Sequence, residues 1–172
     1  WSRANIPLAL RGEEGRVLSR WGEPVWGALV AHGKEAGRFD DELVAATVDL
    51  LRHRWPEAAG VAWVTCIPSR RHPDLVPDFA RRLAAALGVP FRAVIEKSRE
   101  TEPQKHMENP FHQCHNLDGA FVIQDGSDVD GPVLLVDDVV DSAWTLTLAA
   151  ALLKQAGAGA VFPFALATTA AK

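Results

Sequence analysis

The chain of 172 residues has the length of one globular domain, and its 48% of hydrophobic and 23% of charged residues exclude global disorder. The net charge of −4 disfavours a free-standing nucleic-acid-binding protein, and no stretch is apolar over the roughly eighteen residues that cross a membrane. Two cysteines, Cys66 and Cys114, form no CxxC pair, which predicts no disulfide framework and favours a reducing cytoplasm. The start at Trp1 without a methionine suggests a piece of a longer polypeptide, although processing or vector residues would give the same start.

Residues 1–40 form the least periodic part of the sequence, because glycines interrupt its apolar pattern repeatedly. Trp21 and Trp26 are large apolar residues that could pack on the main body or cover a binding site. Two interpretations stay open for this segment: a cover over a ligand site, or a docking segment from a preceding domain. Residues 41–172 are expected to form the main domain.

The first regular elements follow in a strand-helix order. Residues 40–55 carry an apolar stripe behind an aspartate cap and predict a helix. Residues 61–67 are rich in strand-forming side chains, and residues 74–87 predict a helix that ends at Gly88. A strand at 91–95 would complete a β-α-β unit, which predicts a parallel pair with a right-handed crossover.

The second half of the chain continues this alternation. Residues 120–124 predict a short strand, 133–136 a strand buried on both faces, and 146–155 a helix. Residues 160–166 predict the last strand, and Pro163 inside it argues for a sheet edge or a bulge. The sequence therefore predicts an α/β fold with a central, mostly parallel twisted sheet flanked by helices.

The chain is organised around residues 133–147, which read VLLVDDVVDSAWTLT. Asp137 and Asp138 stand where the buried strand should end, and a short loop from Asp141 to Thr145 leads into the next helix. In open α/β sheets, ligands bind at the carboxyl ends of the strands. Backbone N–H groups before a helix attract phosphate, and two carboxylates can accept hydrogen bonds from sugar hydroxyls. The stretch therefore predicts a site for a phosphorylated sugar, and the alternative is an aspartate-rich turn without a ligand.

A basic loop follows the strand predicted at 61–67 and reads Pro-Ser-Arg-Arg-His-Pro. Arg70 and Arg71 could bind a polyanion in bidentate fashion. The loop lies after a buried strand, and so at the same edge of the sheet as the acidic pair. The alternative is a solvated basic turn.

Residues 97–116 are polar and without periodicity, which is typical of a lid, a binding loop or a disordered segment. This segment contains His106, His112, Cys114 and His115, so a zinc site has to be weighed against exposed histidines. The spacing of these residues fits no common finger or zincin pattern. Exposed histidines are the favoured interpretation.

Residues 133–147 resemble the phosphoribosyl-pyrophosphate (PRPP) signature of type I phosphoribosyltransferases, in which an apolar strand, two acids and two apolar residues precede a Thr/Ser-Gly-x-Thr type loop. In one departure, Ala143 stands where that family usually has glycine, which tolerates positive φ, and Trp144 is bulky for the next place. The resemblance covers residues 41–168. Three segments look like the ComF-like phosphoribosyltransferase domain found at the C-terminal end of some bacterial RecQ-family DNA helicases: residues 65–88, 102–121 and 131–147.

The resemblance implies a type I phosphoribosyltransferase fold with a flexible lid at 97–116 and a small hood built from residues 1–40. It implies that the domain binds PRPP or a phosphorylated nucleoside, with Mg²⁺ held through PRPP and not by protein ligands. The implied reaction is transfer of the phosphoribosyl group to a nitrogen heterocycle that the sequence does not identify. The resemblance also implies that the domain is part of a larger RecQ-like DNA helicase, with the helicase domains as attached partners. The alternative is a non-catalytic module that senses PRPP or a nucleotide, or docks, and regulates an attached helicase. Neither direct nucleic-acid binding nor a membrane is implied, and a dimer stays open.

The resemblance also assigns roles to residues. Asp137 and Asp138 would bind the ribose hydroxyls, Arg99 would act on the pyrophosphate, and Asp141 would serve as a base toward the acceptor ring. The alternative for Asp141 is that it only caps the following helix. The other candidates for ligand binding are Ser142, Ala143, Trp144, Thr145, Ser69, Arg70, Arg71, Lys97 and Lys105.

Overall fold

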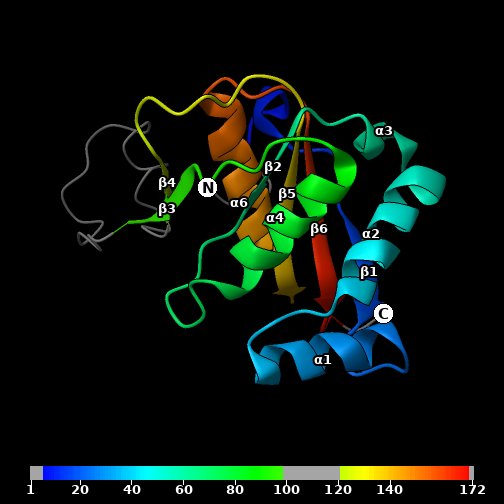
Figure 1. Ribbon diagram of the computed structural model, residues 1–172. Helices are drawn as coiled ribbons and strands as arrows, with labels where there is room; N and C mark the ends of the chain where they lie inside the picture. The colour runs from blue at the N-terminus through cyan, green and yellow to red at the C-terminus, as the bar shows by residue number, and fades with distance from the viewer. Residues whose placement is uncertain (1–5, 99–120, 171–172) are drawn as a thin grey trace.

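The centre of the computed structural model, which describes residues 6–98 and 121–170, is a parallel sheet (Figure 1). Its middle is fully buried, since Val133, Leu134, Leu135 and Val136 have no exposed surface. In spatial order, the strands that the structure describes in this sheet are β1 (Arg16–Arg20), β6 (Val161–Thr168), β5 (Val133–Val140) and β2 (Trp63–Cys66).

Helices cover both faces of the sheet, and alternate residues of β5 pack against different helices (Figure 1). Leu134 and Val136 lie in one apolar cluster with α2 and α4, whereas Val133 and Leu135 lie in a second cluster with α6. The described helices are α1 (Trp26–Ala36), α2 (Asp41–Arg54), α3 (Pro56–Ala59), α4 (Leu75–Leu87) and α6 (Trp144–Gln155), with a short 3-10 helix, η2 (Leu8–Leu10). The predicted α/β fold with a mostly parallel sheet between helices is confirmed.

The strand predicted at 91–95 differs from the one observed. Phe91 makes a single parallel bridge to Val64, and the chain then leaves the sheet. The strand itself is β3 (Ile95–Lys97), which pairs antiparallel with β4 (Phe121–Ile123) in a separate two-stranded sheet. The prediction of a parallel strand was therefore wrong beyond the bridge, because Val94 donates its N–H to Arg92 in a turn and not to β2.

Pro163 was expected at a sheet edge or a bulge, but β6 lies between β1 and β5. The strand tolerates the proline because β1 pairs only from Phe164 onward, whereas Pro163 pairs with Leu135 of β5. The missing N–H of the proline therefore falls just outside the ladder with β1.

The N-terminal segment joins the main body through β1, which pairs with β6. In Figure 1, α1 lies across the lower edge of the sheet, where the arrowheads of β5 and β6 mark the carboxyl ends of the strands. The role of residues 1–40 as a hood or a docking segment stays a prediction. Most of the proposed lid lies outside the described residues. None of the described helices is long and apolar enough to span a membrane.

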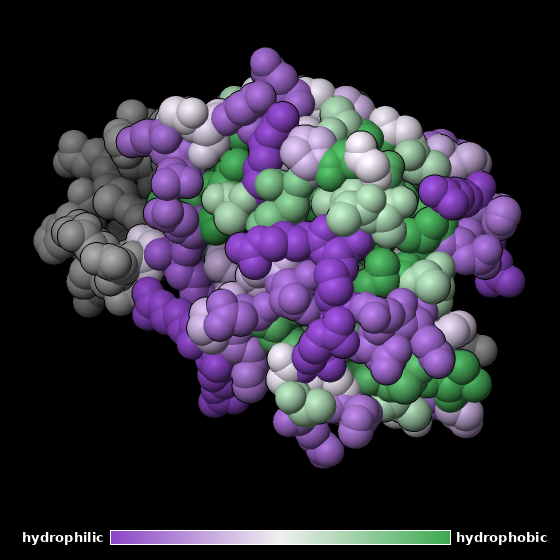
Figure 2. All heavy atoms as spheres, viewed as in Figure 1, coloured by the Kyte–Doolittle hydropathy of each residue, from purple (hydrophilic) through white to green (hydrophobic). Residues whose placement is uncertain are grey.

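The surface in Figure 2 is largely hydrophilic over α4, at the centre of the view. Apolar surface appears at its lower right, over the region where α1 begins in Figure 1. The large apolar side chains with substantial exposure among the described residues are Leu8, Val17, Trp21 and Val25.

Candidate functional site

The acidic pair lies near the carboxyl end of β5, which extends to Val140 and so four residues beyond the predicted strand. Asp137 and Asp138 are both partly buried. Asp137 Oδ1 accepts a hydrogen bond from the N–H of Asp138 at 2.8 Å, and Asp138 Oδ1 accepts one from the N–H of Val139 at 2.6 Å. One oxygen of each carboxylate is thus bound to the backbone, which orients both groups.

Lys34 of α1 forms an ion pair with the second oxygen of Asp138, and the Nζ–Oδ2 distance is 3.0 Å. Sequence reasoning missed this lysine. The sequence shows Lys34 only as a basic residue within the proposed hood, in what is the last turn of α1. This position does not reveal a partner that lies 104 residues further along the chain. The ion pair brings the N-terminal segment into the candidate site.

Asp138 also affects the ionisation of Asp137. Burial, followed by the negative charge of Asp138, raises the pKa of Asp137 to about 7, whereas Lys34 acts in the opposite direction. Burial and Asp137 together raise the pKa of the Cys66 thiol to about 12, so this thiol stays protonated at neutral pH. Asp137 is therefore poised to change charge near neutrality, whereas the neighbouring Cys66 is not.

The loop after β5 carries a strained residue at the start of α6. Ala143 is the N-cap of this helix and has φ 57 and ψ 8, the left-handed conformation that favours glycine. Ser142 Oγ accepts a hydrogen bond from the N–H of Trp144 at 3.4 Å, and Thr147 Oγ1 donates to the carbonyl of Ala143 at 2.9 Å. Ser142, Ala143 and Thr145 are exposed, so the loop presents the N-terminus of α6 to solvent.

Asp141 does not cap α6. Its Oδ1 accepts a hydrogen bond from Thr169 Oγ1 at 3.2 Å, and the N-cap position belongs to Ala143. The capping alternative was wrong, because Ala143 is the N-cap of α6 and the helix begins at Trp144, two residues before the predicted start at Leu146. Asp141 is therefore oriented by the segment that follows β6.

The basic loop follows β2, which pairs with β5, so it emerges at the same edge of the sheet as the acidic pair. Ser69 Oγ accepts a hydrogen bond from the N–H of His72 at 3.3 Å and shapes the turn. Arg70 Nη2 donates to the carbonyl of Ser98 at 2.9 Å and thereby links this loop to the end of β3. Arg70 and Arg71 are exposed, as is Lys97 within β3.

Several predicted residues fall outside the part of the chain that the structure describes. They include two cations assigned to the ligand and the four residues of the zinc alternative. Among residues 6–98 and 121–170, no group of three or more His, Cys, Asp or Glu side chains is placed to hold a metal ion. The predicted residues outside these ranges are Arg99, Lys105, His106, His112, Cys114 and His115.

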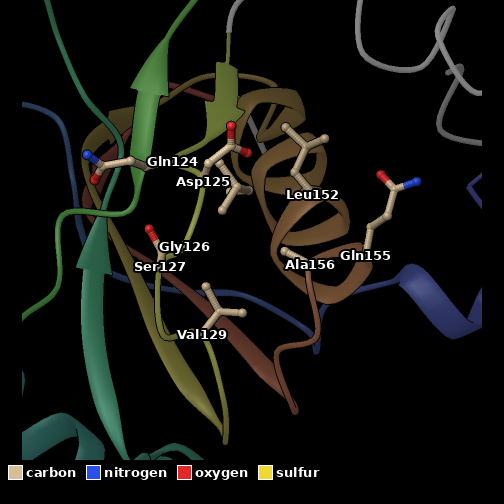
Figure 3. Close-up of a pocket in the computed structure, with 9 residues that line it drawn as sticks. Gln124, Asp125, Gly126, Ser127, Val129, Leu152, Gln155 and Ala156 are labelled. Atoms are coloured by element: carbon tan, nitrogen blue, oxygen red, sulfur yellow. The ribbon is translucent and has the colours of Figure 1, made fainter.

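Within the described part of the chain, a cavity lies near each end of α6. One, of about 490 Å³, is bounded by the loop residues Asp141, Ser142 and Ala143 and, across from them, by Arg16 and Val17 of β1. The other, of about 330 Å³, lies at the opposite end of α6, between that helix and the stretch after β4 (Figure 3). The acidic pair lines neither of these cavities, but the first adjoins the candidate site through the loop before α6.

A sequence model of the family described as "Phosphoribosyl transferase domain" matches residues 78–172, which is more than half of the chain. This range contains the acidic pair and the loop before α6. A comparison with curated protein sequences found no match.

Solved structures with similarity to this chain include adenine phosphoribosyltransferase from Saccharomyces cerevisiae, with 21% identity and a TM-score of 0.47 over 75% of this chain and 70% of that one. The purine phosphoribosyltransferase from Pyrococcus horikoshii Ot3 has 22% identity and a TM-score of 0.48 over 74% and 71%. The glutamine PRPP amidotransferase from B. subtilis has 18% identity and a TM-score of 0.49 over 72% of this chain and 25% of that one. Identities of this size do not bear on ligand or reaction.

Proposed function

Because this chain belongs to the phosphoribosyl transferase domain family, we propose that it binds PRPP with Mg²⁺ at the carboxyl edge of β5 and β2. The observation that carries the proposal is the arrangement of three features at this edge. The acidic pair and the loop before α6 belong to one strand and its exit, and the arginine loop follows the neighbouring strand. This edge therefore has side chains or backbone groups that could bind the sugar, the phosphate and the pyrophosphate of PRPP.

In this proposal Asp137 and Asp138 accept hydrogen bonds from the ribose hydroxyls. The backbone N–H groups at the start of α6, with the side chains of Ser142 and Thr145, bind the 5′-phosphate, because a helix N-terminus attracts anions. Arg70 and Arg71 bind the pyrophosphate, since both are exposed cations at this edge. The remaining proposed ligand-binding residues are Trp144 at the start of α6 and Lys97 at the end of β3.

The residues present fit a magnesium ion that is held through the ligand. The loop at the pyrophosphate end supplies cations and no carboxylate, so the hard oxygens that Mg²⁺ prefers are those of the pyrophosphate itself. When bound, Mg²⁺ offsets the negative charge of the leaving group. Arg70 and Arg71 add to this stabilisation electrostatically.

Transfer of the phosphoribosyl group breaks the bond between the anomeric carbon and pyrophosphate and forms a bond from that carbon to a ring nitrogen of the acceptor. We propose Asp141 as the base that takes the proton from this nitrogen. Its hydrogen bond to Thr169 Oγ1 orients the carboxylate at the exit of β5. Arg99 and Lys105 are proposed to reach the pyrophosphate, and a closed lid would exclude water from the reactive sugar.

A non-catalytic sensor of PRPP or of a nucleotide, which regulates an attached RecQ-like helicase, is the second candidate. The strained Ala143 favours it, because the backbone that would cradle a phosphate is held in a conformation that costs alanine free energy. A dimer and a cytoplasmic location stay predictions.

Calorimetric titration of PRPP in the presence of MgCl₂ tests the proposal. We expect saturable binding that Asp137→Asn combined with Asp138→Asn weakens at least about tenfold, or about 1.4 kcal/mol. Asp125→Asn combined with Asp130→Asn removes two exposed carboxylates elsewhere and should leave the affinity unchanged. An unchanged affinity in the first variant would refute the site. Pyrophosphate release with a panel of nitrogen heterocycles then separates transfer from sensing.

A further inference from the structure

Helix α1 is seated tightly against the carboxyl edge of the sheet. Two of its glycines leave no room for a side chain: a Cβ at Gly27 would collide with the carbonyl oxygen of Arg20, and one at Gly33 would lie 2.6 Å from the ring of Phe39. Val30 on the same helix is fully buried. The backbone that carries Lys34 is therefore held in place relative to the strands.

From this fixed backbone, the side chain of Lys34 extends to Asp138. The ion pair is partly buried, with 31% of the lysine and 15% of the aspartate side chain exposed. Asp138 is held on both oxygens, because Lys34 binds Oδ2 and the N–H of Val139 binds Oδ1. A pair of this exposure is screened less by salt than one on the open surface.

The charge at this point is set by a small number of groups. Asp137 and Asp138 repel each other, and Lys34 is the cation that pairs with them among the described residues. From the neighbouring elements, Cys66 of β2 faces Asp137 as a neutral thiol, and Arg81 of α4 acts on Cys66. Without Lys34, the carboxylate of Asp138 would lose its cationic partner and would repel a phosphate ester that approached it.

We propose that Lys34 is a positioning residue of the sugar site, which holds the carboxylate of Asp138 toward the ligand and offsets its charge so that a ribose phosphate ester can bind. This inference rests on the proposed function and adds a residue from the N-terminal segment to the site. The ion pair does not exclude the sugar, because a carboxylate oxygen has two lone pairs and can accept a hydroxyl beside the ammonium. Lys34 therefore assists the ligand and does not compete with it.

Calorimetric titration of PRPP with MgCl₂ into the wild-type chain and into Lys34→Met tests this role. We expect an affinity about fivefold weaker in the variant, which is about 1 kcal/mol. Lys34→Arg should recover most of the loss, because it restores the charge beside Asp138. Lys154→Met is the matched control, since Lys154 lies in the last turn of α6, at the end of that helix opposite the loop after β5, and should leave binding unchanged.

A second measurement needs no ligand. In the ligand-free chain, carboxylate NMR should show Asp137 titrating at higher pH in Lys34→Met than in the wild type, because Lys34 lowers the pKa of this carboxyl, whereas Asp137 in Lys34→Arg should titrate as in the wild type. Circular dichroism spectra of both variants are compared with that of the wild type, so that loss of the fold is detected separately from a change in titration.

The outcomes separate the two proposals. Absence of PRPP binding in the wild type would overturn the proposed function and this inference with it. PRPP binding of equal strength in the wild type and Lys34→Met would overturn only the role of Lys34. Tighter binding in Lys34→Met would also overturn it, because the lysine would then be a competitor for Asp138.

Discussion

Ala143 has a backbone conformation that its own side chain disfavours. Its φ of 57 places it in the left-handed region, where the Cβ of an L-residue crowds the following carbonyl at a cost of about 1 kcal/mol. The family resemblance expects glycine here, and the structure explains that preference in physical terms: the chain must turn from β5 into α6 within a few residues. The departure seen in the sequence therefore costs stability at the point where a phosphate is proposed to bind.

Ala143→Gly should raise the free energy of unfolding by about 0.5–1 kcal/mol, because glycine adopts positive φ without that crowding and its greater chain entropy offsets only part of the gain. Urea unfolding followed by circular dichroism measures the change. Ala156→Gly is the matched control at the C-cap of the same helix, where φ is −77 and glycine should lower stability or leave it unchanged. Equal effects at both positions would show that the strain at Ala143 is not what limits stability.

At the scale of elements, the placement of α1 decides whether the N-terminal segment belongs to the site. The helix follows the edge strand β1 and returns across the carboxyl ends of β5 and β6 (Figure 1). It can approach this closely because Gly27 and Gly33 lack side chains where the helix meets other backbone. The same contact brings Lys34 within reach of Asp138.

Gly33→Ala should therefore displace α1, because its new methyl group would lie 2.6 Å from the Phe39 ring. We expect a loss of about 1–3 kcal/mol in the free energy of unfolding, together with weaker PRPP binding as Lys34 moves away from Asp138. Gly60→Ala is the control, since a Cβ there meets nothing within 4 Å and the residue has φ −92. Urea unfolding and calorimetry measure the two effects, and a Gly33→Ala chain as stable as the control would contradict the close seating of α1.

At the scale of the whole molecule, the acidic site opposes the stability of the fold. Burial and Asp138 raise the pKa of Asp137 from 3.8 to about 7, so the folded state disfavours the ionised carboxylate that the unfolded chain prefers. Between about pH 4 and pH 7 the folded state binds more protons than the unfolded state at this group. Its contribution to the free energy of unfolding consequently falls as pH rises through this window and is constant above it. The proposed role of Asp137 in binding the ribose gives a functional reason for a carboxylate that lowers the stability of the fold.

The global stability should show this dependence when wild type is compared with Asp137→Asn, which cannot ionise. We expect the variant to gain stability relative to the wild type as pH rises from about 4 to about 7, by at most on the order of 1 kcal/mol per pH unit. Below about pH 4 the difference in free energy of unfolding between the two chains should not change with pH, because Asp137 is then protonated in both the folded and the unfolded state. Urea unfolding at a series of pH values measures the difference, and parallel curves across the window would contradict the raised pKa of Asp137.

How much of this could be read from the sequence depends on the range of the interactions involved. The buried run Val133–Val136, the helix capped at Asp40 and the acidic pair were predictable, because each follows from neighbours along the chain. The loop at Ala143 was also recognised by its residues, although α6 begins at Trp144, two residues before the predicted start, and Asp141 is hydrogen-bonded to Thr169.

The sequence by itself thus determined the α/β alternation, the buried strand, and the place of the acidic and small residues at the end of that strand. It could do so because hydrophobic periodicity and turn preferences depend on residues only a few positions apart. Only the tertiary structure decided that Pro163 lies in an inner strand, that β1 closes the sheet beside β6, and that Lys34 reaches Asp138. These three features depend on close packing between segments that are far apart in the chain. The spacing of residues along a sequence does not show which distant segments come into contact.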